Sequence, residues 1–152
     1  MNKSCTKVAM DFVSPESIQE CSDKYARVYD TRKLQLVDTF CPKHLIKTPD
    51  IHITGMSYSN TSELLVSYNS EHVYLFQKNM GLGPSPIAAS LEHVDSLEEP
   101  QMYSGHRNSL PVKGVSFFGN NSEYVMSGSN CGHIFIWSKK DGRIVRVMEG
   151  DR

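Results

Sequence analysis

The sequence predicts an all-β fold that is built from repeated units. Residues 53–76 and 112–137 share one pattern of apolar and polar positions, and two one-residue gaps align them. Identical residues recur at matched places: Gly55 and Gly114, Ser57 and Ser116, Asn60 and Asn120, Ser62 and Ser122, Glu63 and Glu123, Ser67 and Ser127, His72 and His133. A repeat at this spacing is typical of proteins whose units bury their apolar faces against neighbouring units, and such proteins usually function in binding.

Within each copy, short β-branched and aromatic runs alternate with clusters of Gly, Asn and Ser. This pattern predicts antiparallel strands joined by tight turns. The runs are residues 53–58, 64–66 and 73–76 in the first copy, and 115–118, 124–126 and 134–137 in the second. A fourth strand, residues 144–148, follows the turn at Asp141-Gly142. Four strands per unit is the number found in a blade of a β-propeller.

The remaining segments set the expected domain organisation. Residues 24–30 and 34–40 predict two strands of a further blade, whereas residues 1–22 match the pattern poorly. Residues 79–100 contain Pro, Gly and Ser and few strand signals, so we expect an inserted loop there. The sequence therefore predicts a poorly matching N-terminal segment, followed by a partial propeller over residues 23–152.

The strand pattern also predicts the core. We expect nine to eleven strands in roughly four-stranded groups, with no long helix. The apolar members of these strands should be mostly buried: Met56, Leu65, Leu75, Phe76, Val115, Val125, Ile134, Ile136 and Trp137. Because successive strand residues point to opposite faces, some of these residues should contact a neighbouring blade.

Part of the second copy resembles one WD repeat. The resemblance is carried by Gly105-His106, by the strand pair that follows, and by residues 134–138. Ser138 stands in place of the final Asp of that family. The resemblance implies a propeller fold and a role in binding proteins.

In the WD-repeat family, a His, a Ser or Thr, an Asp and a Trp form a hydrogen-bonded chain inside the blade. The resemblance assigns His106, Ser127 and Trp137 to three places of this structural network. The Asp place, six residues before the Trp, holds Cys131. A thiol is a weak acceptor, so we expect a weaker chain here.

A narrower resemblance covers residues 23–152. It rests on eight blocks in this order: YARVYDTRK, TFCPKHL, ELLVSYN, VYLF, YSGHRNS, VKGVSFFG, YVMSGSNCGHIFIW and MEGDR. These blocks resemble the cullin-4-associated WD-repeat receptors, specifically the eighth numbered member and its plant relatives. The resemblance implies a non-catalytic substrate receptor for protein ubiquitination, which joins a cullin-4 RING ligase through a large propeller adaptor.

In that group, a Trp-Asp-x-Arg motif at the end of the third strand of a blade contacts the adaptor. Tyr29-Asp30-Thr31-Arg32 is similar to this motif, with Tyr in place of Trp. The resemblance thus implies that Tyr29, Asp30 and Arg32 bind the adaptor, with Arg32 as the anchor because a guanidinium can make bidentate contacts. The alternative is that residues 30–32 form an ordinary hairpin turn.

The length of the chain limits the architecture. WD repeats take about 40–45 residues, and a closed ring needs about 4–8 blades. The 152 residues support about two full blades and part of a third, so we expect an unclosed propeller and a fragment of a longer protein. The alternative functions are a generic WD-repeat scaffold fragment or a truncated product without function.

Composition argues against other classes. With 16 Lys and Arg against 17 Asp and Glu, the net charge is −1, so we expect no nucleic-acid partner. No apolar run is long enough to span a membrane, and no secretion signal is present, which predicts an intracellular protein of the nucleus or cytoplasm. The sequence does not identify the substrate protein.

Four cysteines are scattered along the chain, and two of them have ligand-like neighbours. Cys41 precedes His44 by three residues, and Cys131 precedes His133 by two. A zinc site needs about four convergent ligands, and both pairs fit turns between strands, so we expect no metal or cofactor. A catalytic group of Ser127, Cys131 and His133 is not expected either, because the flanking pattern is strand–turn–strand and not that of a nucleophile elbow.

Overall fold

The computed structural model describes residues 6–9, 24–30, 33, 35–59, 61–84, 96–108 and 114–150; for residues 6–9 only the strand is described. Within these residues the regular structure consists of β-strands and two single-turn 3-10 helices, η2 (Lys43–Leu45) and η3 (Lys78–Met80). The all-β prediction is therefore confirmed, and the strand count of the described part is eleven, at the upper end of the expected range.

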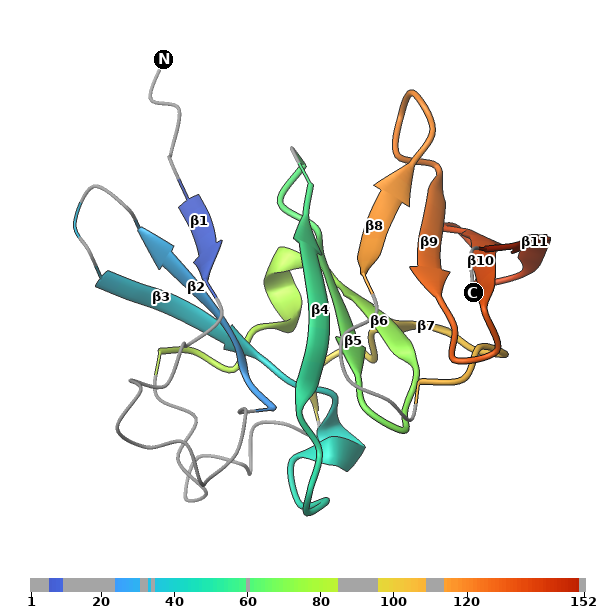
Figure 1. Ribbon diagram of the computed structural model, residues 1–152. Coiled ribbons are helices and arrows are strands. Elements are labelled where there is room, and N and C mark those ends of the chain that lie inside the picture. Colours follow the sequence, from blue (N-terminus) through green and yellow to red (C-terminus); the bar gives the residue numbers. More distant parts are fainter. Residues whose placement is uncertain are drawn as a thin grey trace. The chain divides into compact units, whose positions relative to one another are not determined.

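The strands form three antiparallel sheets (Figure 1). One has three strands in the order β1-β2-β3, the second has four in the order β4-β5-β6-β7, and the third has four in the order β11-β10-β9-β8. These are the two four-stranded blades and the incomplete third blade that a partial, unclosed propeller requires. The bounds are β1 (Thr6–Ala9), β2 (Ala26–Asp30), β3 (Gln35–Phe40), β4 (Ile53–Tyr58), β5 (Leu64–Tyr68), β6 (Val73–Phe76), β7 (Gln101–Tyr103), β8 (Val115–Phe118), β9 (Tyr124–Gly128), β10 (His133–Ser138) and β11 (Ile144–Glu149).

The chain divides into two compact units. The first comprises residues 1–52 and 79–99, and the second comprises residues 53–78 and 100–152. The three-stranded sheet belongs to the first unit, and both four-stranded sheets belong to the second.

The first unit holds part of the predicted loop against the edge strand β3. The amide of Leu82 donates to the Thr39 carbonyl oxygen at 2.7 Å. The amide of Gly83 donates to Asp38 Oδ1 at 2.8 Å, and Thr39 Oγ1 donates to the Gly83 carbonyl oxygen at 2.6 Å. The described start of segment 79–100 therefore has fixed partners. Residues 85–95, the middle of the predicted inserted loop, lie outside the described residues.

Two strands of the fold lie where the sequence shows little signal. β1 lies inside the segment 1–22 that matches the repeat pattern poorly, yet it pairs with β2 in register, with Val8 opposite Val28. β7 follows the inserted segment and pairs with β6, with Tyr103 opposite Val73. β7 completes the first four-stranded sheet, although the loop separates it widely from β6 in sequence.

The second unit confirms the repeat at the level of backbone geometry. The matched residues Ser62 and Ser122 both have positive φ angles, 65° and 54°. Each amide closes the same turn, because Ser62 N donates to the Ser59 carbonyl and Ser122 N to the Gly119 carbonyl. Left-handed backbone is uncommon outside glycine, so its recurrence at one aligned position shows that the two copies share a fold.

The core of the second unit lies between its two sheets. It is formed by Leu65, Val73, Leu75 and Tyr103 of the β4–β7 sheet, which is the first sheet of this unit, and by Val115, Val125 and Trp137 of the β8–β11 sheet, which is its second sheet. All but two of the expected core residues are buried. Met56 and Ile134 are only half-buried, because Met56 lies on the edge strand β4 and Ile134 alternates with the inward-facing Phe135.

Candidate functional site

The expected adaptor motif begins at the end of β2 in the first unit. Tyr29 and Asp30 are the last two residues of this strand and are half-buried. β3 follows β2 in the chain and pairs with it, and in this three-stranded sheet β2 is the middle strand and not the third strand of a complete blade. Arg32 lies outside the described residues. Adaptor binding by these residues stays a prediction.

Asp30 also has a local role. Its Oδ1 accepts a hydrogen bond from the amide of Lys33 at 3.4 Å, across the turn between β2 and β3. Asp side chains commonly stabilise turns in this way. This contact fits the ordinary-turn alternative, and it equally fits a turn that presents an arginine to a partner.

The three residues of the implied blade network lie in or beside the core of the second unit. Trp137 and Ser127 are fully buried, and His106 is 8% exposed. The imidazole of His106 stands edge-on to the indole of Trp137, with ring centroids 5.3 Å apart. The indole N–H of Trp137 donates to the carbonyl oxygen of Ser104 at 2.8 Å.

Hydrogen bonds do not join these three side chains into a chain. Ser127 Oγ donates to the Gly128 carbonyl at 3.1 Å, and both ring nitrogens of His106 are buried without a hydrogen-bond partner. The Asp place offers no carboxylate, and its Cys131 is exposed. Burial, with a smaller effect of His72, lowers the pKa of His106 to about 4. His106 is therefore neutral at pH 7 and contributes by packing.

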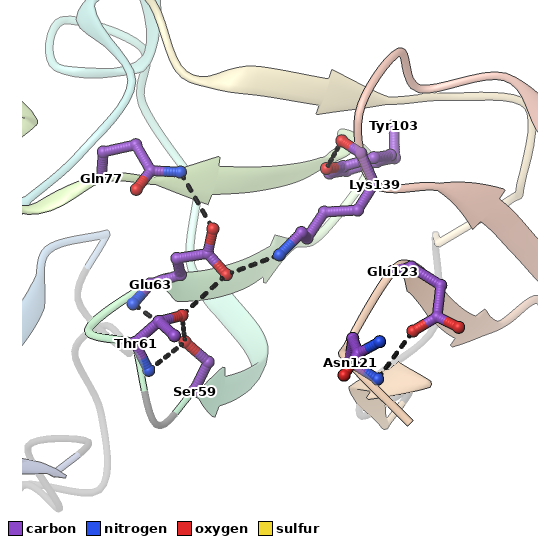
Figure 2. A network of polar contacts seen from close by, with 8 residues as sticks. All are labelled: Ser59, Thr61, Glu63, Gln77, Tyr103, Asn121, Glu123 and Lys139. Atoms are coloured by element: carbon purple, nitrogen blue, oxygen red, sulfur yellow. Dashed lines mark hydrogen bonds and ion pairs between the residues drawn. The ribbon is translucent and has the colours of Figure 1, made fainter. Parts of the chain in front are cut away.

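A polar network that sequence analysis missed ties the two sheets of the second unit together (Figure 2). At its centre, the Glu63 carboxylate accepts hydrogen bonds from Lys139 Nζ at 2.9 Å, Gln77 Nε2 at 3.2 Å and Thr61 Oγ1 at 3.3 Å. Burial alone would raise the pKa of Glu63, but the hydrogen bonds from Lys139 and Gln77 and the charge of Lys139 outweigh it, so the pKa is lowered. The only sequence signal was the identity of Glu63 with Glu123 in the aligned copies.

Lys139 is fixed at several points. Its ammonium group lies 5.9 Å from the centroid of the Phe117 ring, and its amide donates to the Glu123 carbonyl at 2.9 Å. Its own carbonyl accepts from the buried Tyr103 hydroxyl at 2.7 Å, and burial raises the pKa of Tyr103. Because Glu63 and Lys139 satisfy each other, this network is structural and leaves little for a partner to bind.

The outer face of the second sheet carries an apolar groove. The groove has a volume of about 340 Å³ and is lined by Phe118, Tyr124, Met126, Ile136, Val145, Arg146 and Met148. On its rim, Phe118 is 49% exposed and Val145 is 42% exposed. Clustered, exposed apolar side chains of this kind commonly mark a surface that binds another protein.

The chemistry-bearing side chains of the second unit converge only in part. Cys131 and His133 are in contact, with Sγ 3.2 Å from Nδ1, whereas Ser127 is buried and bonds elsewhere. Within the described residues, no group of three or more His, Cys, Asp or Glu side chains could hold a metal ion. No helix in that part of the chain has the length and apolar character needed to cross a membrane.

Comparison with known families supports one class for this fold. Residues 97–138 match the family described as WD domain, G-beta repeat. The matched segment contains β7 of one four-stranded sheet and β8, β9 and β10 of the next, so a single sequence repeat spans two sheets. Residues 97–138 are therefore similar to one WD repeat, and the strands of the fold agree with that similarity.

Individual relatives are similar over parts of the chain. Human WD and tetratricopeptide repeats protein 1 is 36% identical over 51% of this chain and 14% of its own length. WD repeat protein iqw1 of Schizosaccharomyces pombe is 49% identical over 32% of this chain and 6% of its own. Human DDB1- and CUL4-associated factor 6 is 47% identical over 40% and 8%. The chain therefore spans at most 14% of the length of these relatives.

Proposed function

We propose that this chain is part of a substrate receptor of a cullin-4 RING ubiquitin ligase, in which it binds proteins and carries out no catalysis. The observation that carries the proposal is the place of Tyr29-Asp30 at the end of β2, directly before the turn to β3. The similarity to a protein named as CUL4-associated supports it. Its partners are the cullin-4 adaptor and a substrate protein, in the nucleus or cytoplasm.

The turn after β2 is stabilised by a side chain of the motif itself. Asp30 accepts a hydrogen bond from the amide of Lys33, which stabilises this turn. A guanidinium presents several N–H donors in a rigid plane, so an arginine on a fixed turn can bind carboxylates or carbonyls of a partner with defined geometry. A lysine at the same place would act only as a point charge.

A second candidate function is that of a general WD-repeat scaffold, independent of cullin-4. The apolar groove on the second sheet favours it, because this surface can bind a protein without any contribution from Arg32. The two candidates predict different sensitive residues, which an experiment on the whole chain can separate.

The test is a pull-down of the cullin-4 adaptor with the wild-type chain and the variants Arg32→Ala and Lys33→Ala. Loss of an interface anchor commonly costs about 2 kcal/mol or more, so Arg32→Ala should weaken binding about thirtyfold. Lys33 is the matched control, since loss of general charge attraction would weaken both variants equally. Equal binding by Arg32→Ala and wild type overturns the role of this arginine, and recovery of no adaptor by the wild-type chain overturns the proposal for this chain.

A further inference from the structure

β11 is the outermost strand of the second sheet of the second unit, and none of its residues belongs to the core (Figure 1). Among the described strands, only β10 pairs with it. Its six residues include no Pro or Lys, and Ile144, Val145 and Val147 are between 42% and 46% exposed. An unpaired edge strand of apolar residues is a template on which a further strand can pair, and proteins commonly protect such edges.

The equivalent edge strand of the first sheet, β7, is better protected. It has only three residues, one of which is exposed. The turn between β10 and β11 also lies close to it, since a Cβ on Gly142 would come within 2.8 Å of the Met102 carbonyl oxygen. β11, by contrast, is twice as long, and five of its six residues are exposed. The open edge of this unit is therefore at β11.

The hydrogen bonds of the sheet show which backbone groups of β11 face the free edge. Gly150 N donates to the Gly132 carbonyl, and hydrogen-bonded pairs alternate with non-hydrogen-bonded pairs along an antiparallel ladder. The next pair is His133 and Glu149, and the His133 carbonyl is already used by the residue that follows β9. The N–H and C=O groups of Glu149, and those of Val147 two residues earlier, therefore point away from β10.

The apolar groove adjoins the same part of β11. The register shifts only before Arg146, so residues 146–149 form a regular ladder with β10. Arg146 and Met148 line the groove, and Arg146 is the one charged residue of its lining. Within the described residues, no hydrogen bond or ion pair engages the Arg146 guanidinium. A cation beside an apolar groove is complementary to a carboxylate that is flanked by apolar side chains.

We propose that the free edge of β11 binds an extended, acidic and apolar segment of a partner protein as an additional antiparallel strand. A carboxylate of the segment lies opposite Arg146, and an apolar side chain lies opposite Met148. Val147 and Glu149 exchange backbone hydrogen bonds with the segment. In this mode of recognition the backbone bonds supply affinity, and alternate side chains supply specificity. The inference rests on the scaffold function proposed for the groove, names its partner class, and does not depend on Arg32.

Charge favours this partner over a second copy of the chain. Residues that face the shared edge lie opposite each other in an antiparallel pair. Two β11 edges would therefore place Arg146 opposite Arg146, Met148 or Gly150 of the other copy. None of these residues carries a carboxylate, and like charges directly opposite each other are destabilising.

The test is the binding of a fluorescein-labelled peptide, Ser-Thr-Leu-Val-Glu-Thr, to the full chain, measured by fluorescence anisotropy. In antiparallel pairing its Glu is opposite Arg146, its Val is opposite Val147, and its Leu is opposite Met148. A peptide with Lys in place of Glu should bind up to about fivefold more weakly. The chain with Arg146→Glu should reverse this preference, whereas the control Arg143→Glu should keep it. An unchanged preference for the Glu peptide in Arg146→Glu overturns the proposal.

Two methylated peptides separate strand addition from binding of side chains to the groove alone. N-methylation of the peptide Val removes an N–H that points toward β11 and should weaken binding about tenfold, whereas N-methylation of the Glu removes one that points away and should have an effect below about twofold. Equal binding of the two methylated peptides overturns strand addition and leaves the scaffold function of the groove standing. Failure of every peptide to bind at millimolar concentration also overturns the proposal.

Hydrogen exchange measured by NMR reports on the edge directly. Saturation with the parent peptide should slow exchange of the Val147 and Glu149 amides by about tenfold, because they become paired. The amides of Arg146 and Met148, which face β10, should change much less. Dimerisation of the chain without peptide, accompanied by slow exchange of the same two edge amides, would assign the edge to a second copy and overturn the proposal.

Discussion

The two four-stranded sheets of the second unit have the same topology and related sequences, but they differ in burial. Every residue of β5 and β6 in the first sheet is buried. In the second sheet, the corresponding strands β9 and β10 each contain only two buried residues. The aligned pair Val66 and Met126 shows the difference directly, since Val66 is fully buried and Met126 lines the groove.

This difference teaches that a repeated sequence fixes strands and turns without fixing burial. Alternate residues of a strand point to opposite faces, so a strand that is buried throughout needs cover on both faces. β9 follows the pattern of a sheet covered on one face, with Val125 in the core and Tyr124 in the groove. The environment of each unit therefore depends on its neighbours, as expected for a repeat architecture.

The largest effect should come from the inner face of the second sheet. Trp137→Ala removes a fully buried indole and its hydrogen bond to Ser104, at a cost of about 3–5 kcal/mol. We expect the variant to lose cooperative unfolding in urea. The control is Val145→Ala on the outer face, where the side chain is 42% exposed. This variant should lose only about 0.5 kcal/mol of unfolding free energy. If Trp137→Ala unfolds in urea in the same way as the wild-type chain, Trp137 does not lie in the core.

The next effect depends on pH and on the buried His106. Its pKa is lowered in the folded state from 6.5 to about 4, so below pH 6.5 the unfolded chain binds a proton that the folded chain does not. Stability should therefore decrease as the pH falls from 6.5 to 4, by roughly 3 kcal/mol in all.

The measurement is the free energy of unfolding at several pH values for the wild-type chain and for His106→Gln. The variant should lose most of the decrease between pH 6.5 and 4, even if its stability at pH 8 is lower because the contact with Trp137 has changed. If both chains show the same pH slope, His106 is not neutral in the folded state or is not buried.

A matched pair of truncations tests the comparison itself. Val66→Ala in the first sheet should cost about 2 kcal/mol, because a fully buried valine leaves a cavity. Met126→Ala at the aligned position should cost less, although it removes more atoms, because this side chain lines an open groove. Urea unfolding of the two variants measures both values. A larger cost for Met126→Ala would mean that the outer face of the second sheet is covered in solution.

The smallest effect should come from the network that joins the sheets. Lys139→Met keeps an apolar contact with Phe117 but removes a donor from the partly buried Glu63, which should cost about 1–2 kcal/mol at pH 7. Since the pKa of Glu63 is lowered by folding, the contribution is fully present above the unfolded pKa of about 4.3 and is lost as the pH falls through the lower folded value.

The control for this network is Lys140→Met, which removes the same charge from the exposed neighbouring position. Unfolding in urea at pH 7 and pH 3 should show a difference between the two variants at pH 7 only. Equal stability of the two variants at pH 7 would mean that the Glu63–Lys139 pair contributes no more than an ordinary surface ion pair.

Local features of the sequence determined the strands and turns of the repeat. The apolar runs gave β4 and β8 with their observed bounds, because period-two alternation and turn-forming residues act over a few positions. The aligned Ser62 and Ser122 close the same turn. The burial of Trp137 also followed from its place at the end of an apolar strand.

Tertiary structure decided the features that join distant segments. β7 has three residues and few local strand signals, and it forms because β6 offers an unpaired edge. The bond between Glu63 and Lys139 spans 76 positions, and both ring nitrogens of His106 are buried without a hydrogen-bond partner. Such contacts depend on how whole sheets pack, and that packing is set by the sum of many weak interactions that no short stretch of sequence contains.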